Sequence, residues 1–219
     1  MSALLEMRGL KKALGGRTLL WLERLTLNRG GSYLLSGDNG AGKTTLLRVI
    51  AGLEPASVQR FEFDGTPLSL DDYPRSLRSR IAFVHDHPFV FSSSVEENVG
   101  YGLRALGVAP GEASRRVTQA LEWAGIEQHA HKRAQTLSAG EKQRLALARV
   151  HVLDPLLYLL DEPTANLDED GRRRVIGLIE AIAREGRTLV VACHDRELLS
   201  LPTVQRLRMA QGRLVPDQT

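Results

Sequence analysis

Short apolar runs separated by polar turns occupy both ends of the chain, and helical periodicity fills its middle. In the N-terminal part the apolar runs predict short strands at residues 19–22, 25–27, 33–35, 61–63 and 81–84. A polar, glycine-containing turn at residues 28–31 separates two of these strands. This part of the chain is therefore expected to be rich in β-structure.

The middle of the chain has the spacing of amphipathic helices, which predicts helices at residues 94–106, 112–124 and 138–152. Further on, apolar strands at residues 156–160 and 188–192 flank an amphipathic helix at residues 170–185. Strands as uniformly apolar as these are typical of a parallel sheet that is covered on both faces. The pattern indicates an α/β fold.

Composition narrows the class of protein. A chain of 219 residues with 42% apolar content fits one domain, with room for an inserted subdomain. The net charge of +3 is spread along the sequence rather than gathered in blocks, so we expect no nucleic-acid partner. The single cysteine, Cys193, allows no internal disulfide and indicates a reducing compartment. We expect Cys193 to be a small buried residue rather than a nucleophile.

The N-terminal residues 1–10 contain no apolar run of the length found in signal peptides. No stretch approaches the ~20 consecutive apolar residues of a membrane span. Any association with a membrane is therefore expected to go through a partner protein.

The strongest chemical signal is a glycine-rich phosphate-binding loop that lies between a predicted strand and a predicted helix. Glycines let backbone N–H groups turn toward a phosphate, and a helix N-terminus adds a favourable dipole. The lysine supplies a charge for the β- and γ-phosphates, and the threonine hydroxyl can ligate Mg²⁺. The predicted nucleotide-binding residues here are Gly37, Asp38, Asn39, Gly40, Ala41, Gly42, Lys43, Thr44 and Thr45.

Two acidic residues follow the apolar strand at residues 156–160. Asp161 stands where a second Mg²⁺ contact is expected, because the carboxyl end of such a strand lies beside the phosphate loop in a parallel sheet. Glu162 is then placed to orient or deprotonate the attacking water. The sequence thus predicts an ATP and Mg²⁺ site with Thr44 and Asp161 as metal ligands.

Residues 137–144 read Leu-Ser-Ala-Gly-Glu-Lys-Gln-Arg, and this segment resembles the LSGGQ signature of the ATP-binding cassette (ABC) ATPases. The residues alone, without this resemblance, predict a capping box formed by Ser138 and Glu141 before an apolar helix. The N-terminus of such a helix is suited to binding an anion. The resemblance extends to the phosphate loop, to the Asp161–Glu162 pair, to Asn166-Leu167-Asp168 and to His194, all in family order.

The resemblance implies a P-loop NTPase core of the ABC type with a mostly parallel sheet, an antiparallel N-terminal β part and an inserted helical subdomain at about residues 87–152. It implies a single nucleotide-binding domain over residues 1–219 and real ATPase activity. It also implies a head-to-tail dimer, in which Ser138 and Gly140 contact the γ-phosphate that the opposite subunit holds. Glu162 and His194 would be the catalytic residues.

Three positions depart from the family pattern. Leu14 stands where the family has an aromatic residue that stacks on adenine, so base selectivity is expected to be weaker. Asp86 replaces the glutamine of the Q-loop, and we hypothesise that its carboxylate keeps the metal-linked role. A dedicated metal site at residues 85–87 is the weaker alternative, because histidines two residues apart in a loop are usually solvated. In the signature, Ala139 and Glu141 replace glycine and glutamine.

Residues 93–103 resemble the corresponding segment of bacterial importers, and the apolar residues 89–91 before it suit a docking groove for a membrane permease. The alternative is that they pack inside the helical subdomain. Resemblance favours a tungstate-type importer, with an indirect solute-binding protein partner and a peripheral position on the cytoplasmic face of the inner membrane. Competing hypotheses are an importer of another small solute, a soluble cassette protein, or a non-hydrolysing regulatory cassette.

Overall fold

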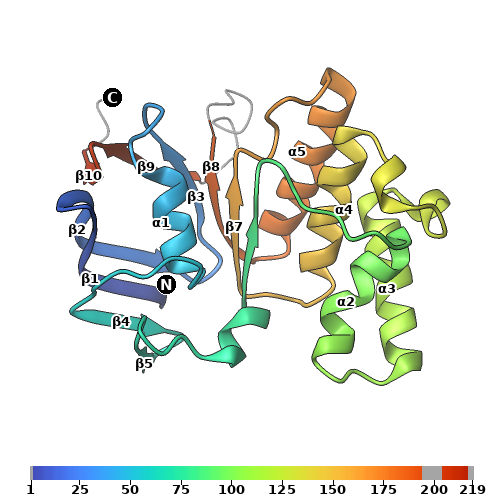
Figure 1. The fold of residues 1–219 in the computed structure, drawn as a ribbon, viewed down its shortest axis with the longest axis horizontal. Coiled ribbons are helices and arrows are strands. Elements are labelled where there is room, and N and C mark those ends of the chain that lie inside the picture. Colours follow the sequence, from blue (N-terminus) through green and yellow to red (C-terminus); the bar gives the residue numbers. More distant parts are fainter. Residues whose placement is uncertain (1, 194–203, 217–219) are drawn as a thin grey trace.

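The structure is a computed structural model that describes residues 2–193 and 204–216. Within them the chain forms two sheets and a set of helices (Figure 1). The antiparallel sheet has the order β2-β1-β4-β5. Its strands are β1 (Ala3–Leu14), β2 (Arg17–Asn28), β4 (Arg60–Phe63) and β5 (Thr66–Leu68).

The larger sheet has the order β10-β9-β3-β8-β7-β6, and all its described neighbours are parallel except β9 and β10. Its strands are β3 (Ser32–Ser36), β6 (Ile81–Val84), β7 (Leu157–Asp161), β8 (Thr188–Ala192), β9 (Val204–Ala210) and β10 (Arg213–Val215). The α-helices are α1 (Lys43–Ile50), α2 (Val95–Ala105), α3 (Pro110–Ala124), α4 (Ala139–His151) and α5 (Glu169–Arg184). The predicted fold, a mostly parallel sheet with an antiparallel N-terminal β part and inserted helices, is confirmed.

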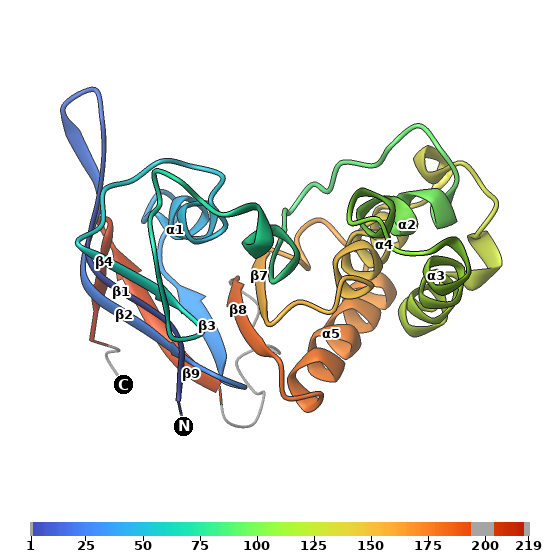
Figure 2. The same ribbon diagram turned by 90° about the horizontal axis from the view of Figure 1, so that it is seen from below.

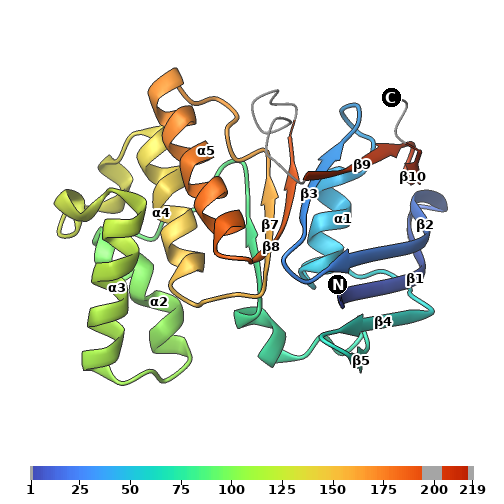
Figure 3. The same cartoon turned by 180° about the vertical axis from the view of Figure 1, so that it is seen from behind.

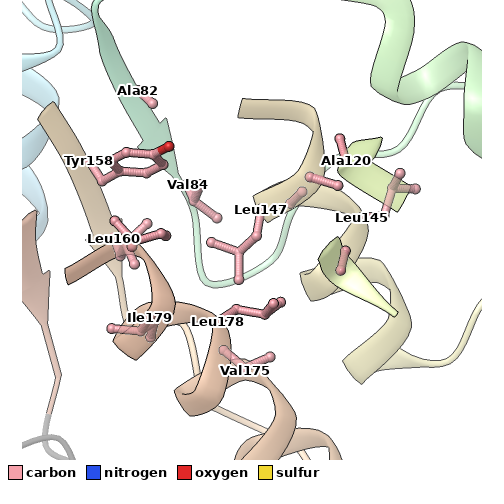
Figure 4. Close-up of a cluster of buried hydrophobic side chains, with 14 of the residues drawn as sticks. Ala82, Val84, Ala120, Leu145, Leu147, Tyr158, Leu160, Val175, Leu178 and Ile179 are labelled. Carbon is pink, nitrogen blue, oxygen red and sulfur yellow. The ribbon is translucent and has the colours of Figure 1, made fainter. Parts of the chain in front are cut away.

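Side-chain alternation along the central strands divides the core into two clusters. On β7, Tyr158 and Leu160 pack with α2, α3, α4 and α5, whereas Leu157 and Leu159 pack with α1 and the antiparallel sheet. Strands buried on both faces read as continuous apolar runs, which explains the sequence pattern. Figure 2 shows the helices α2–α5 on one side of β7 and α1 on the other, and Figure 4 shows the cluster on the helical side.

Two features of the fold differ from the sequence prediction. The runs at residues 19–22 and 25–27 belong to one continuous strand, β2, because the exposed Arg24 between them keeps its pairing with Arg8 of β1. The strands β1, β5, β9 and β10 were not predicted. Charged residues interrupt β1, β5 has only three residues, and β9 is only partly buried and lacks an apolar run.

The turn between β9 and β10 fixes the phosphate loop from a distant part of the sequence. The N–H of Gly212 donates to the carbonyl of Ala41 at 2.9 Å, and the carbonyl of Gly212 accepts from the N–H of Trp21 at 2.9 Å. The loop is therefore tied to β2 and to the C-terminal hairpin, which lie side by side in Figure 3.

Among the described residues, we find no helix with both the length and the apolar content needed to cross a membrane.

Candidate nucleotide site

The phosphate loop connects β3 to α1 and has the backbone that its glycines predict. Gly42 is the N-cap of α1 with φ of 105°. Gly37 has φ of 144°, and a Cβ atom there would lie 2.2 Å from the carbonyl oxygen of Met209. Both positions require glycine, since other residues rarely adopt such φ values and Gly37 has no room for a side chain. Lys43 is buried, and its Nζ donates to the carbonyl of Gly37 at 2.7 Å.

Thr44 and Asp161 meet at the edge of the sheet, as the sequence predicted. The Thr44 hydroxyl donates to Oδ1 of Asp161 at 3.1 Å. Burial raises the pKa of Asp161 above its ordinary value, and the hydrogen bond from Thr44 opposes that shift. Two hard oxygen ligands at this spacing, one of them a buried carboxylate, suit Mg²⁺.

Glu162 begins a tight turn directly after β7. Its backbone has φ of 46°, a conformation uncommon for any residue with a side chain. The N–H of Glu162 donates to the carbonyl of Ala192 at 2.7 Å, and its carbonyl accepts from the N–H of Ala165. The turn thus holds the half-buried glutamate at the ends of β7 and β8. His194 comes two residues after Ala192 and lies outside the described residues.

Asp86 follows β6 and is held by its two neighbouring histidines. Nδ1 of His87 lies 2.8 Å from Asp86 Oδ2, and Nδ1 of His85 also contacts the carboxylate. Burial raises the pKa of Asp86, but the hydrogen bond from His87 and the nearby imidazoles outweigh it and lower the pKa overall. The negative charge of Asp86 in turn contributes to the raised pKa of Asp161, so the two carboxylates lie in one electrostatic environment.

The ligand atoms of residues 85–87 lie within 4.8 Å of one another, as a metal site would require. However, the guanidinium of Arg48 lies 2.7 Å from Nε2 of His85. Arginine can only donate, so Nε2 must accept and the proton is on Nδ1, pointing at Asp86. A histidine that binds a metal through Nδ1 has no proton on Nδ1, and its Nε2–H needs an acceptor. Arg48 is a donor and cannot be that acceptor. The arrangement supports a hydrogen-bonded carboxylate rather than a separate metal site.

A cavity of about 720 Å³ adjoins the outer side of the phosphate loop. Its lining includes Arg17 and Leu19 of the β1–β2 hairpin, Asn39 of the loop and Gln211 of the C-terminal hairpin. Leu14 is 71% exposed at the end of β1 and does not line the cavity. None of the described residues that line this cavity is aromatic, so a base bound there would meet Leu19, Arg17 and polar groups in place of an aromatic ring.

The signature segment begins α4 with the predicted capping box. The N–H of Glu141 donates to the Ser138 hydroxyl at 3.3 Å, and the Glu141 carboxylate accepts from the N–H of Ser138 at 2.8 Å. A Cβ on Gly140 would lie 3.2 Å from the Cα of Gly171, so α4 and α5 approach closely here. A cavity of about 440 Å³ opens at this point, lined by Ser138, Gly140 and residues of the α5 N-terminus.

The structure brings together the phosphate loop, Thr44, Asp161 and Asp86, but it does not add Ser138 and Gly140 to them. Helix α1 packs in the cluster on one face of the larger sheet and α4 packs in the cluster on the other. The cavities beside the phosphate loop and beside Ser138 share no lining residue. One chain therefore keeps the two predicted parts of the site, the phosphate loop and the signature segment, apart.

Two contacts escaped the sequence analysis. Arg48 reaches His85, and His129 contacts Glu141 at 2.8 Å. The first joins residues 37 positions apart, so no local pattern shows it. For the second, Glu141 in place of glutamine was a signal that a donor stands nearby.

A phosphate loop between strand and helix, an aspartate and glutamate at the end of the adjacent strand, and a capped signature helix define an ATP-binding cassette ATPase. The model of the ABC transporter family matches residues 23–165, which is more than half of the chain. The chain belongs to this family, and its activity is ATP hydrolysis.

Among curated relatives, the chain is 35% identical to the cell division ATP-binding protein FtsE of Haemophilus influenzae, over 96% of this chain and 99% of that protein. It is 36% identical to the Fe(3+) ions import ATP-binding protein FbpC of Escherichia coli O157:H7, over 87% of this chain and 55% of that protein. The solved structure of cbiO1 from Clostridium perfringens, part of the ABC transporter complex cbiONQ, matches with a TM-score of 0.86 and 32% identity, covering 99% of this chain and 88% of that one.

Proposed function

We propose that this chain is the ATP-hydrolysing subunit of a bacterial ABC importer and works as a head-to-tail dimer on a membrane permease. The observation that carries the dimer is that the central sheet separates the phosphate loop from the signature segment, which we call the two half-sites. Ser138 cannot reach the phosphate loop of its own chain, so a second copy must supply the signature to each bound triphosphate. The relatives named for iron import and for the cbiONQ transporter support the transport role.

Each residue of the proposed site has its own role in ATP hydrolysis. Lys43 and the loop amides hold the phosphates, and Glu162 takes or orients the proton of the attacking water. Mg²⁺, held by Thr44 and Asp161 with Asp86 nearby, would neutralise charge that develops on the β- and γ-phosphates. Ser138 and Gly140 of the opposite subunit, with His194, would fix the γ-phosphate in line for attack.

An exposed aromatic group supports docking to a permease. Phe89 is 71% exposed and Tyr101 is 53% exposed. Phe91 packs between them, edge to face with Phe89 at a centroid distance of 5.5 Å and tilted against Tyr101 at 4.6 Å. Arg149 covers Phe91 and donates to the carbonyl of Phe89 at 2.8 Å. Val90 instead packs against the core, so the predicted alternative of internal packing holds for that one residue. Apolar surface of this kind marks an interaction site, and it lies directly after the Q-loop.

The transported solute is proposed as tungstate or a related oxyanion, on the resemblance of residues 93–103 and 163–168 to that group of importers. The ATPase does not touch the solute, so uptake by the assembled complex is the test. A vesicle assay with this chain, its permease and a solute-binding protein should show ATP-dependent uptake of tungstate. Uptake of iron or a polyamine alone would reject an oxyanion as the solute and keep the importer. Uptake of molybdate alone would reject tungstate and keep an oxyanion importer.

The enzymatic part is tested by phosphate release from Mg·ATP and by light scattering. Glu162→Gln should abolish turnover and accumulate an ATP-bound dimer, because the substrate stays bound without being hydrolysed. Glu169→Gln, a change of the same chemistry on the exposed first turn of α5, is the matched control and should behave as the native chain. Turnover by Glu162→Gln, or a monomer at saturating ATP, would refute the mechanism.

A further inference from the structure

His129 connects the segment between α3 and α4 to the signature. It ends a short 3₁₀ turn, Glu127–His129, and its Nε2 lies 2.8 Å from Oε1 of Glu141. The other oxygen of that carboxylate, Oε2, accepts from the N–H of Ser138 at 2.8 Å. One carboxylate therefore joins His129 to the residue that begins the signature helix. The side chains of His129 and Glu141 are only 15% and 25% exposed, so water competes weakly for this contact.

The hydrogen-bonding direction follows from the other ring nitrogen. Nδ1 of His129 is buried and has no hydrogen-bond partner among the described residues. A buried N–H without an acceptor costs more than a bare nitrogen lone pair, so the proton is on Nε2 and is donated to Glu141. The Glu141 carboxyl is a strong acceptor because it is ionised. The hydrogen bond from the N–H of Ser138 lowers the pKa of Glu141 most, burial opposes this shift, and His129 lowers the pKa further.

A second contact joins the same two segments one helical turn further along α4. The Arg144 guanidinium donates to the carbonyls of Ala124 and Gly125 at 3.0 and 2.6 Å, at the C-terminal end of α3. Glu141 and Arg144 are three residues apart and so share a face of α4. The connection between α3 and α4 is thus attached to the first turns of the signature helix at two points.

We propose that His129 is a positioning residue for the signature: its hydrogen bond to Glu141 holds the capping box, and through it Ser138, in the orientation that meets the triphosphate of a second copy. Glu141 places a carboxylate near the place where that triphosphate would lie. The hydrogen bond from His129 draws part of this charge away and keeps the carboxylate turned toward the Ser138 N–H. This inference rests on the proposed head-to-tail dimer.

The test uses the full chain with Glu162→Gln, so that ATP-bound dimers accumulate, and measures the ATP concentration for half-maximal dimerisation by light scattering. His129→Leu removes the donor, and His129→Gln keeps an N–H at similar reach. His131→Leu is the matched control, because His131 lies in the same connection, is exposed and contacts Glu96 instead. Hydrogen bonds to charged groups are strong enough that we expect a shift of about tenfold for His129→Leu. His129→Gln should stay within about twofold and His131→Leu should not shift.

Glu141→Ala separates positioning from general packing. On this background His129→Leu should add almost nothing, since the partner that it positions is already gone. Nucleotide binding to the monomer at low protein concentration should be the same in all variants, because the phosphate loop lies on the other face of the sheet. If His129→Leu does not fold, His129→Asn, which is too short to reach Glu141, replaces it in the comparison with His129→Gln.

Each possible result either supports or overturns the positioning role of His129. Unchanged dimerisation in His129→Leu, or an equal loss in His129→Gln, would overturn the positioning role. An undiminished effect of His129→Leu on the Glu141→Ala background would overturn it as well. If the parent chain with Glu162→Gln forms no dimer at any ATP concentration, the proposed assembly itself fails, which is a distinguishable outcome.

Discussion

Replacing Gly37 by alanine should damage the phosphate loop far more than the same change at Gly40. Both glycines have positive φ, 144° and 79°. A Cβ atom on Gly37 would lie 2.2 Å from the carbonyl oxygen of Met209 and 3.1 Å from its carbon, whereas a Cβ atom on Gly40 would meet nothing within 4 Å. The obstacle at Gly37 is backbone of β9, which pairs with β3 and cannot rotate away as a side chain could.

The magnitude follows from two contributions. A residue with a Cβ at positive φ costs about 1–2 kcal/mol, and both variants incur this. At Gly37 the overlap must be relieved by moving β9 or the loop, which adds about 1–3 kcal/mol, as overpacking does. For a domain of this size each kcal/mol lowers Tm by about 2–4 °C. We therefore expect a loss of about 4–20 °C for Gly37→Ala and about 2–8 °C for Gly40→Ala.

Differential scanning calorimetry of the two purified variants measures these losses, and equilibrium binding of ATP provides a second measurement. Gly37→Ala should also weaken ATP binding, because any movement of the loop turns its amides away from the phosphates. Equal Tm losses in the two variants would refute the reasoning, since the contact with Met209 would then cost nothing. Loss of ATP binding with no loss of Tm would show that the loop moves without disturbing β9.

Four further changes test other parts of the structure. Asp161→Asn should raise Tm at pH 7.5, because burial raises the pKa of this carboxyl and so makes its ionised form unfavourable in the folded chain. The gain in Tm should disappear in acid, where the native carboxyl is protonated as well. ATPase activity should fall by more than about 100-fold, because the proposed metal ligand is lost. Asp64→Asn should lower stability to urea at pH 7.5, because the hydrogen bond from Arg80 and the charge of Arg29 lower the pKa of Asp64 despite partial burial. This stabilisation is lost as the pH falls through the lowered pKa. The variant and the native chain should therefore have the same stability in strong acid. Leu14→Tyr should tighten ATP binding by about 2- to 10-fold, measured by calorimetric titration, because a longer, aromatic side chain at this exposed position adds a surface on which the base can stack. Tyr158→Phe should lower the free energy of unfolding in urea by about 1 kcal/mol, because the ring stays packed while His151 loses its hydrogen bond at 3.0 Å.

The parts of the fold that depend on local pattern could be predicted from the sequence. The capping box at Ser138 was predicted because its two residues are three positions apart, and it is present in the structure. A second capping box at Ser94 has the same spacing but was not predicted. The buried strands β7 and β8 were recognisable because both of their faces are covered, which demands apolar residues at every position. The same reasoning placed Asp161 beside Thr44, because parallel strands end at a common edge.

The contacts that escaped prediction are those set by tertiary structure alone. Strand β9 exposes Gln205 and Arg206 and gains its place from pairing with β3 rather than from its own pattern. The hydrogen bond between Gly212 and Ala41 joins residues with no local relation, yet it holds the loop on which the chemistry depends. A sequence shows where the glycines are, but it does not show the neighbouring strand that leaves no room for a side chain.

A path through the helical core joins the two proposed half-sites of one chain. Helix α4 starts after Ser138 and ends at His151, whose ring stacks on Trp123 of α3 at a centroid distance of 3.9 Å and hydrogen-bonds to Tyr158. Tyr158 is fully buried on β7, three residues before Asp161. Burial lowers the pKa of His151, so the ring is neutral near pH 7 and the contact carries no charge to be solvated. A movement of the signature helix must therefore either break this contact or shift the strand that ends in Asp161, and a close-packed core favours the second.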